Sequence, residues 1–279
     1  MLLNNNLTQL SSCERRLFRL VPEGPATYAT LHLLRELIKR DLSARFTGSA
    51  LGLAWAVLQP LSFVALYWFV FTFMIPGGRL GSGSGDAYIY FLIAGLLPWL
   101  GFSEGLSRAT TSIVESSAIV RKLPLRSEVL VIVPNATALI FQGIGLAIFI
   151  IALGARGMPL RQLWVLPFAL VLQFLLQLGI GFFLATTYVF FRDVPHIITF
   201  VLAIGFYLSP ILYGVSGKFE KYFFWNPMTP LLGLFRSAML ASPLPDGGSI
   251  VYLVTVAAFV CAAGLLFYRR AQPSLVDVI

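Results

Sequence analysis

The sequence predicts an all-α membrane protein that crosses a bilayer six times, and three observations support this fold class. Of the 279 residues, 58% are hydrophobic and only 11% are charged, whereas a soluble domain carries about 25% charged residues. The apolar residues gather in long runs, and a helix needs about 20 such residues to cross the hydrocarbon core. The formal net charge of +8 comes from cations that flank these runs. Membrane topology therefore explains the charge better than nucleic-acid binding does, and no nucleic-acid partner is expected.

Residues 26–46 predict an amphipathic helix that lies in the membrane interface. Its apolar stripe faces the acyl chains, and its cations lie near the lipid headgroups. The stripe consists of residues at helical spacing, namely Leu34, Leu37, Ile38, Leu42 and Phe46. The next stretch, from Leu51 to Met74, holds no charged residue and is long enough to span the membrane. Span 1 is therefore expected at about 51–75.

Five more spans are expected at about 87–107, 129–153, 163–190, 196–215 and 249–268. Pro98 lies inside the second span, where it predicts a kink. Glu104 and Arg108 are four residues apart near the end of that span, a spacing at which they could pair.

The segments between the spans are short, and two of them have a pattern of their own. Residues 109–128 are too polar to span the membrane, and they predict a short cytoplasmic helix with a turn at Pro124. Residues 216–248 are too short for two spans and too apolar for a solvated loop, which predicts short re-entrant or interfacial helices. The domain plan is thus a tail at 1–25, the interface helix at 26–46, a six-helix domain at 47–270 and a tail at 271–279.

The distribution of cations predicts the orientation of the chain. With six spans, both termini lie on one side. That side carries fourteen of the 20 Lys and Arg residues, against six on the other side. Cytoplasmic loops are the ones enriched in Lys and Arg, so both termini are expected in the cytoplasm.

No enzyme signature stands out in the sequence. GSGSG at 81–85 is not flanked by a strand and a helix, so it is interpreted as a flexible loop and not as a phosphate-binding loop. The two cysteines, Cys13 and Cys261, are too far apart in sequence to indicate a disulfide scaffold or a metal motif. The expected spans hold no acidic residue apart from Glu104, whereas ion-coupled transporters carry ionisable groups in their spans. Energy for any transport is therefore expected from a partner, and no metal or cofactor is expected on this chain.

Aromatic residues make up 14% of the chain, and some of them are candidates for a channel lining. Sugar rings stack their C–H faces on aromatic rings, so such a lining would pass a polysaccharide without gripping one position tightly. A lipid-facing belt of aromatic residues is the alternative interpretation for each of them. The candidates are Phe63, Tyr67, Phe71, Trp99, Tyr207 and Tyr213.

Five stretches together resemble one family. They are RDLSARFTGSALGLAWAVLQP at 40–60, the segment 90–128 that begins YFLIAGLLPWLGF, FFRDVPHI at 190–197, SPILY at 209–213 and WNPMTPLLGLFR at 225–236. In this order on a six-span chain, they resemble the membrane subunit of ABC transporters that export lipid-linked polysaccharide, the O-antigen, capsule and teichoic-acid exporters. The resemblance covers most of residues 30–270.

The resemblance implies a bacterial cytoplasmic-membrane channel made by two copies of the chain. Two separate ATPase subunits would dock from the cytoplasm and would bind the ATP and Mg²⁺, and the cargo would be a polyprenyl-pyrophosphate-linked glycan. The cytoplasmic loop would couple to the ATPase through Ile113, Val114, Glu115, Ile119, Arg121 and Lys122. The segment after span 5 would gate the periplasmic exit through Phe223, Trp225, Leu231 and Leu234. The interface helix would meet the headgroups, the pyrophosphate or the ATPase through Arg40, Asp41 and Arg45.

Three rival functions fit parts of the sequence. The same architecture could export a drug or a lipid. A membrane enzyme acting on polyprenyl phosphate would need paired carboxylates, whereas Asp41 and Asp193 are isolated in sequence and each has an Arg neighbour. A channel without an ATPase would not need the loop at 109–128.

Overall fold

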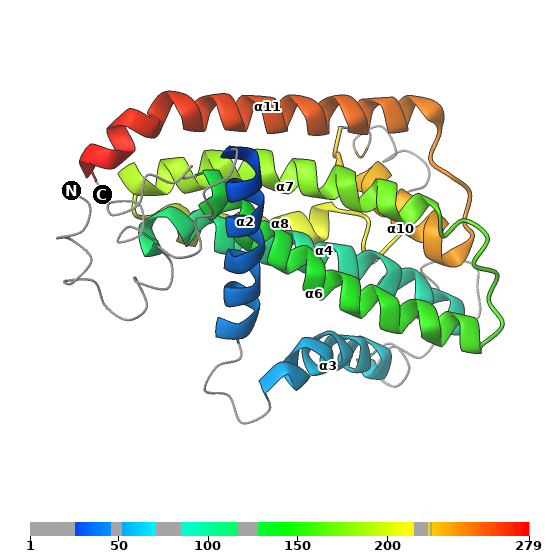
Figure 1. The fold of residues 1–279 in the computed structure, drawn as a ribbon. Coiled ribbons are helices and arrows are strands. Elements are labelled where there is room, and N and C mark those ends of the chain that lie inside the picture. Colours follow the sequence, from blue (N-terminus) through cyan, green and yellow to red (C-terminus); the bar gives the residue numbers. More distant parts are fainter. Residues whose placement is uncertain are drawn as a thin grey trace.

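All the regular secondary structure in the described part of the chain is helical (Figure 1). The computed structural model describes residues 26–45, 52–70, 85–116, 128–214, 223 and 225–278. Within these ranges it holds no strand, which confirms the all-α part of the prediction. The helices are α2 (Ala26–Ala44), the 3₁₀ turn η2 (Gly52–Ala54), α3 (Trp55–Phe69), α4 (Gly85–Glu115), α6 (Glu128–Ala155), α7 (Val165–Phe190), α8 (Val194–Leu208), α10 (Met228–Leu240) and α11 (Gly247–Val278).

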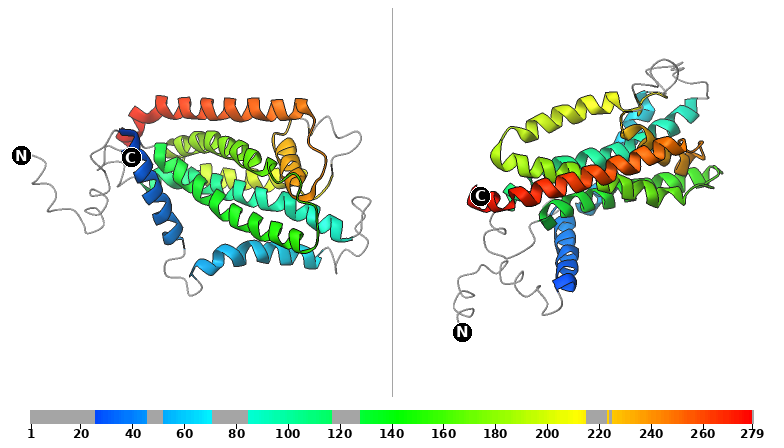
Figure 2. Two further views of the ribbon diagram at one scale, coloured as in Figure 1. Left: turned by 45° about the vertical axis from the view of Figure 1, so that its right-hand side comes forward. Right: turned by 90° about the horizontal axis from the view of Figure 1, so that it is seen from above.

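Four helices, α4, α6, α7 and α11, are long and apolar enough to cross a membrane. They lie side by side in one bundle, and α2 runs across one end of it (Figures 1 and 2). We call this end, where α4, α7 and α11 finish, the α2 end, and we call the opposite end, where α10 lies, the α10 end. Helices α8 and α10 are shorter apolar helices, so the six-span count stays a prediction.

Helix α2 packs on the bundle through part of its apolar stripe. Leu33 and Leu37 are buried against Val129 and Val133 at the start of α6. On the other face of α2, the Lys39 ammonium donates a hydrogen bond to Glu36, and this bond lowers the pKa of that carboxyl. The stripe therefore packs partly against protein, and this packing on α6 fixes α2 across the α2 end.

Helix α4 continues past the expected end of span 2. The polar residues that were expected to begin a separate helix at 109 are part of α4 as far as Glu115. The hydroxyls of Thr110 and Ser112 donate to the carbonyls of Leu106 and Ala109 on the same helix. Their polarity is thus satisfied inside the helix and does not end it. The expected turn at Pro124 lies outside the described residues.

Two other helix ends also differ from the predicted spans. Helix α8 finishes at Leu208, earlier than the expected 215, because Ser209 is extended and Pro210 follows it. Helix α11 continues through Arg269 to Val278, so the residues expected as a tail are helical. Arg269 donates to Glu128 at the start of α6, with 3.0 Å between Nε and Oε1, which ties the two helices at the α2 end.

The core combines close backbone contacts with buried amides. A Cβ atom at Gly264 would collide with the Gly179 backbone, so these two glycines let α7 and α11 touch. Between α6 and α7, the amides of Gln142 and Gln173 bond each other reciprocally at 2.9 and 2.6 Å. Gln177 donates to the Gly101 carbonyl on α4 at 2.9 Å. These bonds give partners to the amides of Gln142 and Gln173 and to the Gln177 nitrogen, all fully or nearly fully buried, and they hold α4, α6 and α7 together.

Candidate functional site

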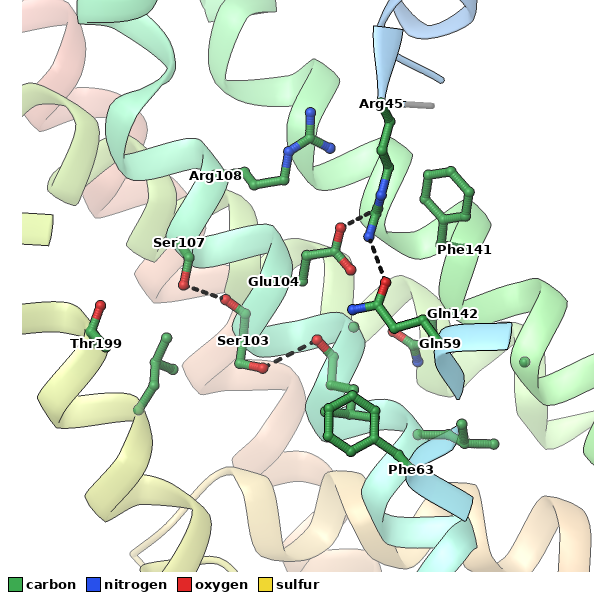
Figure 3. Close-up of a pocket in the computed structure, with 15 residues that line it drawn as sticks. Arg45, Gln59, Phe63, Ser103, Glu104, Ser107, Arg108, Phe141, Gln142 and Thr199 are labelled. Atoms are coloured by element: carbon green, nitrogen blue, oxygen red, sulfur yellow. Dashed lines mark hydrogen bonds and ion pairs between the residues drawn. The ribbon is translucent and has the colours of Figure 1, made fainter. Parts of the chain in front are cut away.

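A cavity of about 530 Å³ opens between α3, α4, α6 and α8 (Figure 3). Helix α4 forms its floor, with Leu97, Leu100, Gly101, Ser103, Glu104, Ser107 and Arg108. Gln59 and Phe63 reach it from α3, Phe141 and Gln142 from α6, and Thr199 and Leu202 from α8. Apolar, hydroxyl and amide groups are mixed along the walls, so the cavity offers both stacking surface and hydrogen bonds.

Gly101 determines how closely α4 and α6 approach at the floor of the cavity. A Cβ atom at this position would overlap the Gln142 side chain. Without a side chain at 101, Gln142 lies against α4 and bonds Gln173 behind it. The amide is therefore fixed in the wall, with its hydrogen bonds directed into the core.

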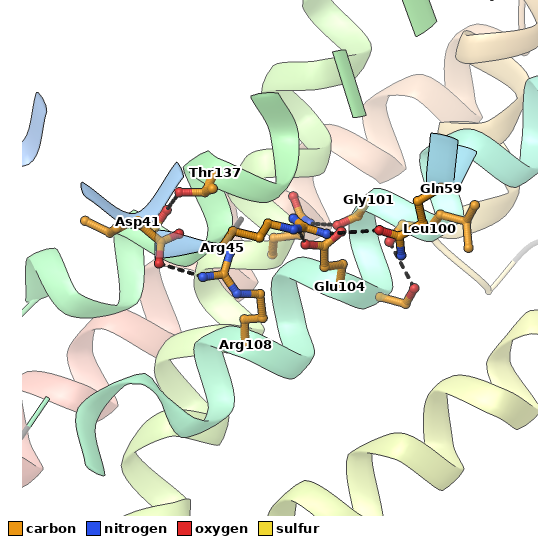
Figure 4. Close-up of polar contacts among 11 residues, drawn as sticks. Asp41, Arg45, Gln59, Leu100, Gly101, Glu104, Arg108 and Thr137 are labelled. Carbon is orange, nitrogen blue, oxygen red and sulfur yellow. Dashed lines mark hydrogen bonds and ion pairs between the residues drawn. The ribbon is translucent and has the colours of Figure 1, made fainter. Parts of the chain in front are cut away.

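Two ion pairs join α2 to α4 beside the cavity (Figure 4). Arg108 donates to Asp41 with 2.6 Å between Nη2 and Oδ1, and Arg45 pairs with Glu104. We call these four residues the α2–α4 clamp. Glu104 and Arg108, which could have paired along their own helix, pair across to α2 instead. Helix α2 supplies an opposite charge for each of them, at the same four-residue spacing.

The clamp is electrically neutral and only partly exposed. The exposed fractions of its four side chains lie between 19% and 31%. The Arg45 guanidinium also lies 4.1 Å from the centre of the Phe141 ring and 3.4 Å from the Gln59 amide oxygen. Asp41 Oδ2 and Arg108 Nη1 are buried and have no hydrogen-bond partner within the described ranges. Arg45 and Arg108 are thus already committed to carboxylates.

A second cavity, of about 600 Å³, lies on the other side of the clamp. It is lined by Arg40, Asp41 and Arg108 and, at the end of α4, by Glu115 and Ser116. Arg108 borders both cavities. The Asp41–Arg108 pair therefore lies between this cavity at the α2 end and the first cavity in the bundle.

The comparison with a known family covers most of the chain. The family described as ABC-2 type transporter matches residues 32–240. The chain belongs to this family. The matched residues include the clamp, the residues that line both cavities, and α10.

Three relatives match this ABC-2 chain over almost its whole length. The O-antigen export system permease protein RfbA of Myxococcus xanthus is 27% identical over 263 residues, which cover 92% of this chain and 98% of that protein. A permease of the same name from Klebsiella pneumoniae is 24% identical over 257 residues, 88% of this chain and 95% of that protein. The polysialic acid transport protein KpsM of Escherichia coli is 22% identical over 247 residues, 86% of this chain and 93% of that protein. The names of these relatives thus describe transport proteins, and two of the three are named permeases.

The structure places the predicted channel-lining residues in different surroundings. Phe63 lines the cavity. Trp99 is buried between α4 and α8, against Phe206, and it is not part of the cavity wall. Tyr207 is exposed on α8, and the Tyr213 hydroxyl donates to its carbonyl. Phe71 and the side chain of Tyr67 lie outside what the structure describes, so the lining role of the set stays a prediction.

The predicted gate residues form no single surface. Leu231 and Leu234 are buried in the core on α10. Trp225 is 73% exposed, and its carbonyl accepts a hydrogen bond from Tyr252 on α11. The Phe223 ring packs edge-on against Tyr213, with 5.7 Å between ring centres. Their gating role stays a prediction.

The predicted coupling residues are only partly described. Ile113 is buried in a cluster with Val131 and Tyr268, and Val114 packs against that cluster. Glu115 is exposed at the end of α4. Residues Ile119, Arg121 and Lys122 lie outside the described residues. No group of three or more His, Cys, Asp or Glu side chains that could hold a metal occurs in the residues searched.

Sequence reasoning missed two features of the site. Gln59, Ser103 and Thr199 line the cavity but carry no motif. Arg236 was counted only as an outer-side cation, yet only 7% of it is exposed. The available signal was its position as the one charged residue in the apolar run PLLGLFRSAML, because a cation inside such a run needs buried partners.

Proposed function

We propose that the chain is the transmembrane subunit of an ATP-driven exporter that moves a lipid-linked polysaccharide out of the cytoplasm. The observation that carries the proposal is the near full-length match to O-antigen and polysialic acid export permeases. Two copies of the chain form the channel, and two separate ATPase subunits bind ATP and Mg²⁺. The cargo is a glycan on a polyprenyl pyrophosphate, and the membrane is the bacterial cytoplasmic membrane.

The chemistry of the cavity supports a polysaccharide as cargo. Phe63 offers a ring face for the C–H face of a sugar, and Ser103, Ser107 and Thr199 offer hydroxyls. The two arginines at the edge of the cavity are neutralised by carboxylates, so the wall holds no strong net charge that would bind one unit of the polymer tightly. A wall with many weak contacts lets a long chain slide.

The distribution of the helices supports the proposed topology. Helices α3 and α8 serve as spans 1 and 5, α2 is the interface helix, and α10 is the re-entrant helix on the periplasmic side. The α2 end is then cytoplasmic, as are both termini, which agrees with the excess of Lys and Arg on that side. Membrane lipid surrounds the spans and the apolar stripe of α2.

A second copy would close the cavity into a channel. The cavity lies between α3 and α8, and both helices also carry exposed apolar side chains that a second copy can cover in place of lipid. On α3 and α8 these include Leu58, Leu61, Leu66, Ile197, Phe200 and Ile204. Pairing of these faces in a homodimer would bury them and would enclose the polar cavity wall.

The first test is purification from the native membrane in mild detergent, followed by mass spectrometry of bound protein and lipid. An ATPase subunit in equal amount together with a polyprenyl-linked glycan is the expected result. Co-purification of an ATPase with a drug or a simple lipid would support an exporter but would contradict a polysaccharide as its cargo. A chain that purifies without any ATPase would overturn the proposal.

The second test places a bulky side chain in the cavity. We expect Ser103→Trp to remove most polysaccharide from the cell surface and to leave lipid-linked polysaccharide inside, because the indole fills the floor of the channel. Val251→Trp, on the exposed face of α11, is the matched control and should export normally. Normal surface polysaccharide in the Ser103→Trp strain would contradict a channel through this cavity.

A further inference from the structure

The end of α8 at the α10 end is a helix break that side chains from other elements hold in place. After Leu208 the backbone turns away from the helix, and Ser209 is extended. The last carbonyls of a helix have no partner in their own helix, and in a membrane protein such groups must be satisfied by other parts of the protein. Residues 209–211 are nevertheless buried, so the carbonyls of this break need donors from elsewhere.

Three side chains supply those donors. Arg236 on α10 donates from Nη2 to the carbonyls of Pro210 at 2.7 Å and of Ile211 at 3.1 Å. The Tyr88 hydroxyl on α4 donates to the Leu212 carbonyl at 2.7 Å. The Asn226 amide donates to the Leu208 carbonyl at 3.1 Å. We call Tyr88, Asn226 and Arg236, with the carbonyls that they bind, the α8 latch.

Asn226 ties the end of α8 to the start of α10. Its amide nitrogen bonds the last turn of α8, and its side-chain oxygen accepts the backbone N–H of Met228 at 2.9 Å. One side chain thus satisfies a carbonyl of one helix end and an N–H of the next. A movement of the α8 end would break the first of these bonds or carry the start of α10 with it.

Arg236 is the central member of the latch. Its guanidinium lies 3.5 Å from the centre of the Phe91 ring, and its Nε donates to the Phe91 carbonyl at 3.4 Å. A Cβ atom at Gly95 would lie 2.8 Å from its Nη2, so this glycine leaves the space that the guanidinium fills. The structure gives Arg236 no carboxylate partner among the residues that it describes. The cation is therefore held by carbonyl dipoles and a ring, all of which belong to α4 or to the α8 break.

The far half of helix α8 is packed less tightly than its start. Its buried residues are Val194 and Ile198, both near its start at the α2 end. Beyond them Leu202 and Phe206 pack against the core while only partly buried, Gly205 meets Trp99, and the helix lies at the edge of the bundle (Figure 2). The helix is thus anchored by packing at one end and by the latch at the other. Thr199 and Leu202, which line the cavity, lie between the two anchors.

We infer that Arg236 is a positioning residue that latches a movable wall of the channel. With the latch closed, α8 stays against α4, and when it is released α8 swings about its packed start and widens the cavity toward the α10 end. The inference rests on the proposed function, because it assigns to α8 the opening that export of a polymer requires. Arg236 acts through the backbone of residues 210 and 211 and not by contact with the cargo.

The test measures the accessibility of the break directly. Ser209 is buried, so a cysteine there should react slowly with N-ethylmaleimide while the latch is closed. Both natural cysteines are first replaced, Cys13→Ser and Cys261→Ala, and Ser209→Cys is added to the full chain in membranes with its ATPase. Because N-ethylmaleimide crosses membranes, the labelling rate does not depend on the orientation of the chain.

We expect Arg236→Gln to raise the labelling rate of Ser209→Cys by about tenfold or more, because two carbonyls lose a charged donor. Tyr88→Phe, which removes one hydroxyl and leaves the ring, should raise it by a smaller factor and keeps the test decisive if Arg236→Gln does not accumulate. Arg156→Gln is the matched control: Arg156 is an exposed cation at the same end that bonds Tyr90, and its loss should leave the rate unchanged. Equal rates for the parent, Arg236→Gln and Tyr88→Phe would overturn the latch.

A second readout links the latch to transport. Labelling of Ser209→Cys should be faster in vesicles that hydrolyse ATP during export than in vesicles without ATP. A rate that ATP does not change would show that the break never opens in the cycle, and would overturn the moving wall. Labelling that responds to Arg236 and to ATP in a chain that exports no polysaccharide would leave the latch standing and contradict the proposed function.

Discussion

The α2 end and the α10 end hold their cations in opposite ways. In the α2–α4 clamp, each arginine faces a carboxylate, and the four charges cancel. In the α8 latch, Arg236 has carbonyl oxygens and an aromatic ring as partners. The clamp joins two intact helices along their sides, whereas the latch joins a side chain to the broken end of a third helix.

The comparison teaches what each arrangement can fix. The clamp alternates charge on both sides: Asp41 on α2 and Arg45 directly after α2 are four residues apart, and Glu104 and Arg108 are four apart on α4. A slide of one helix by one turn, about 5.4 Å, would set like charges against each other. The clamp thus selects one register between α2 and α4. The latch sets no register, but it exists only while the carbonyls of the α8 break point at Arg236.

The largest effect is expected from removing the cation of the latch. Arg236→Leu leaves the carbonyls of Pro210 and Ile211 buried without donors, and each such group costs about 1–3 kcal/mol. We expect the free energy of unfolding to fall by about 2–6 kcal/mol in total. Thermal unfolding of the purified protein in detergent measures the loss. Arg236→Lys keeps one charged donor and should recover part of it, and a stability of Arg236→Leu equal to the parent would refute the role of these bonds.

The clamp can be tested by exchanging its opposite charges, a test that the latch does not allow. Asp41→Arg places a second cation opposite Arg108, and Arg108→Asp places a second carboxylate opposite Asp41. Each change alone should therefore lower stability and export. The double variant Asp41→Arg with Arg108→Asp restores opposite charges and should recover much of both. The coupling energy of this double-mutant cycle is expected within about 0.5–3 kcal/mol. Additive losses in the double variant would mean that the two residues do not interact.

The sequence predicted the helical membrane fold and the four long spans, but not where several helices end. Hydropathy falls at Ala109 and again at Arg269, yet α4 and α11 continue. Their polar side chains bond their own backbone or a neighbouring helix, and this is invisible in a count of apolar residues. Pro210, in contrast, marks in the sequence the break that ends α8 early.

Local sequence patterns could not predict the partners of the charged residues. Asp41 and Arg108 are 67 positions apart, so only the crossing of α2 over α4 brings them together. The (i, i+4) rule offered Glu104 a partner on its own helix, and the tertiary structure provides a different one. Arg236 stood out in its apolar run, but its acceptors are backbone atoms that exist only because α8 is broken.

A smaller effect is expected from filling the space beside the latch. Gly95→Ala would place a methyl group 2.8 Å from Arg236 Nη2, and such overpacking costs about 1–3 kcal/mol. The gain in helix propensity of up to about 1 kcal/mol partly offsets this cost. Gly143→Ala on α6 has nothing within 4 Å of the added atom and should only gain. Melting temperatures of the two variants should therefore move apart, and a Gly95→Ala protein as stable as Gly143→Ala would show that the guanidinium has room to shift.

The smallest effect concerns Asp246, an exposed carboxylate at the α10 end that has no ion pair with another described residue. It accepts the backbone N–H of Ser249 at 3.0 Å and the hydroxyl of that residue at 2.6 Å, and so caps the start of α11. These bonds favour the ionised form and lower the pKa of the carboxyl. Because the folded pKa lies below the unfolded one, the cap contributes stability above about pH 4 and loses it as the pH falls through the folded pKa.

Asp246→Asn keeps an oxygen acceptor that does not titrate. We therefore expect amide hydrogen exchange at the start of α11 to accelerate more in the parent than in Asp246→Asn between pH 6 and pH 3, after correction for the intrinsic rates. Equal acceleration in the two proteins would show that the exposed carboxylate, unlike the arginines of the clamp and the latch, contributes nothing to holding its helix.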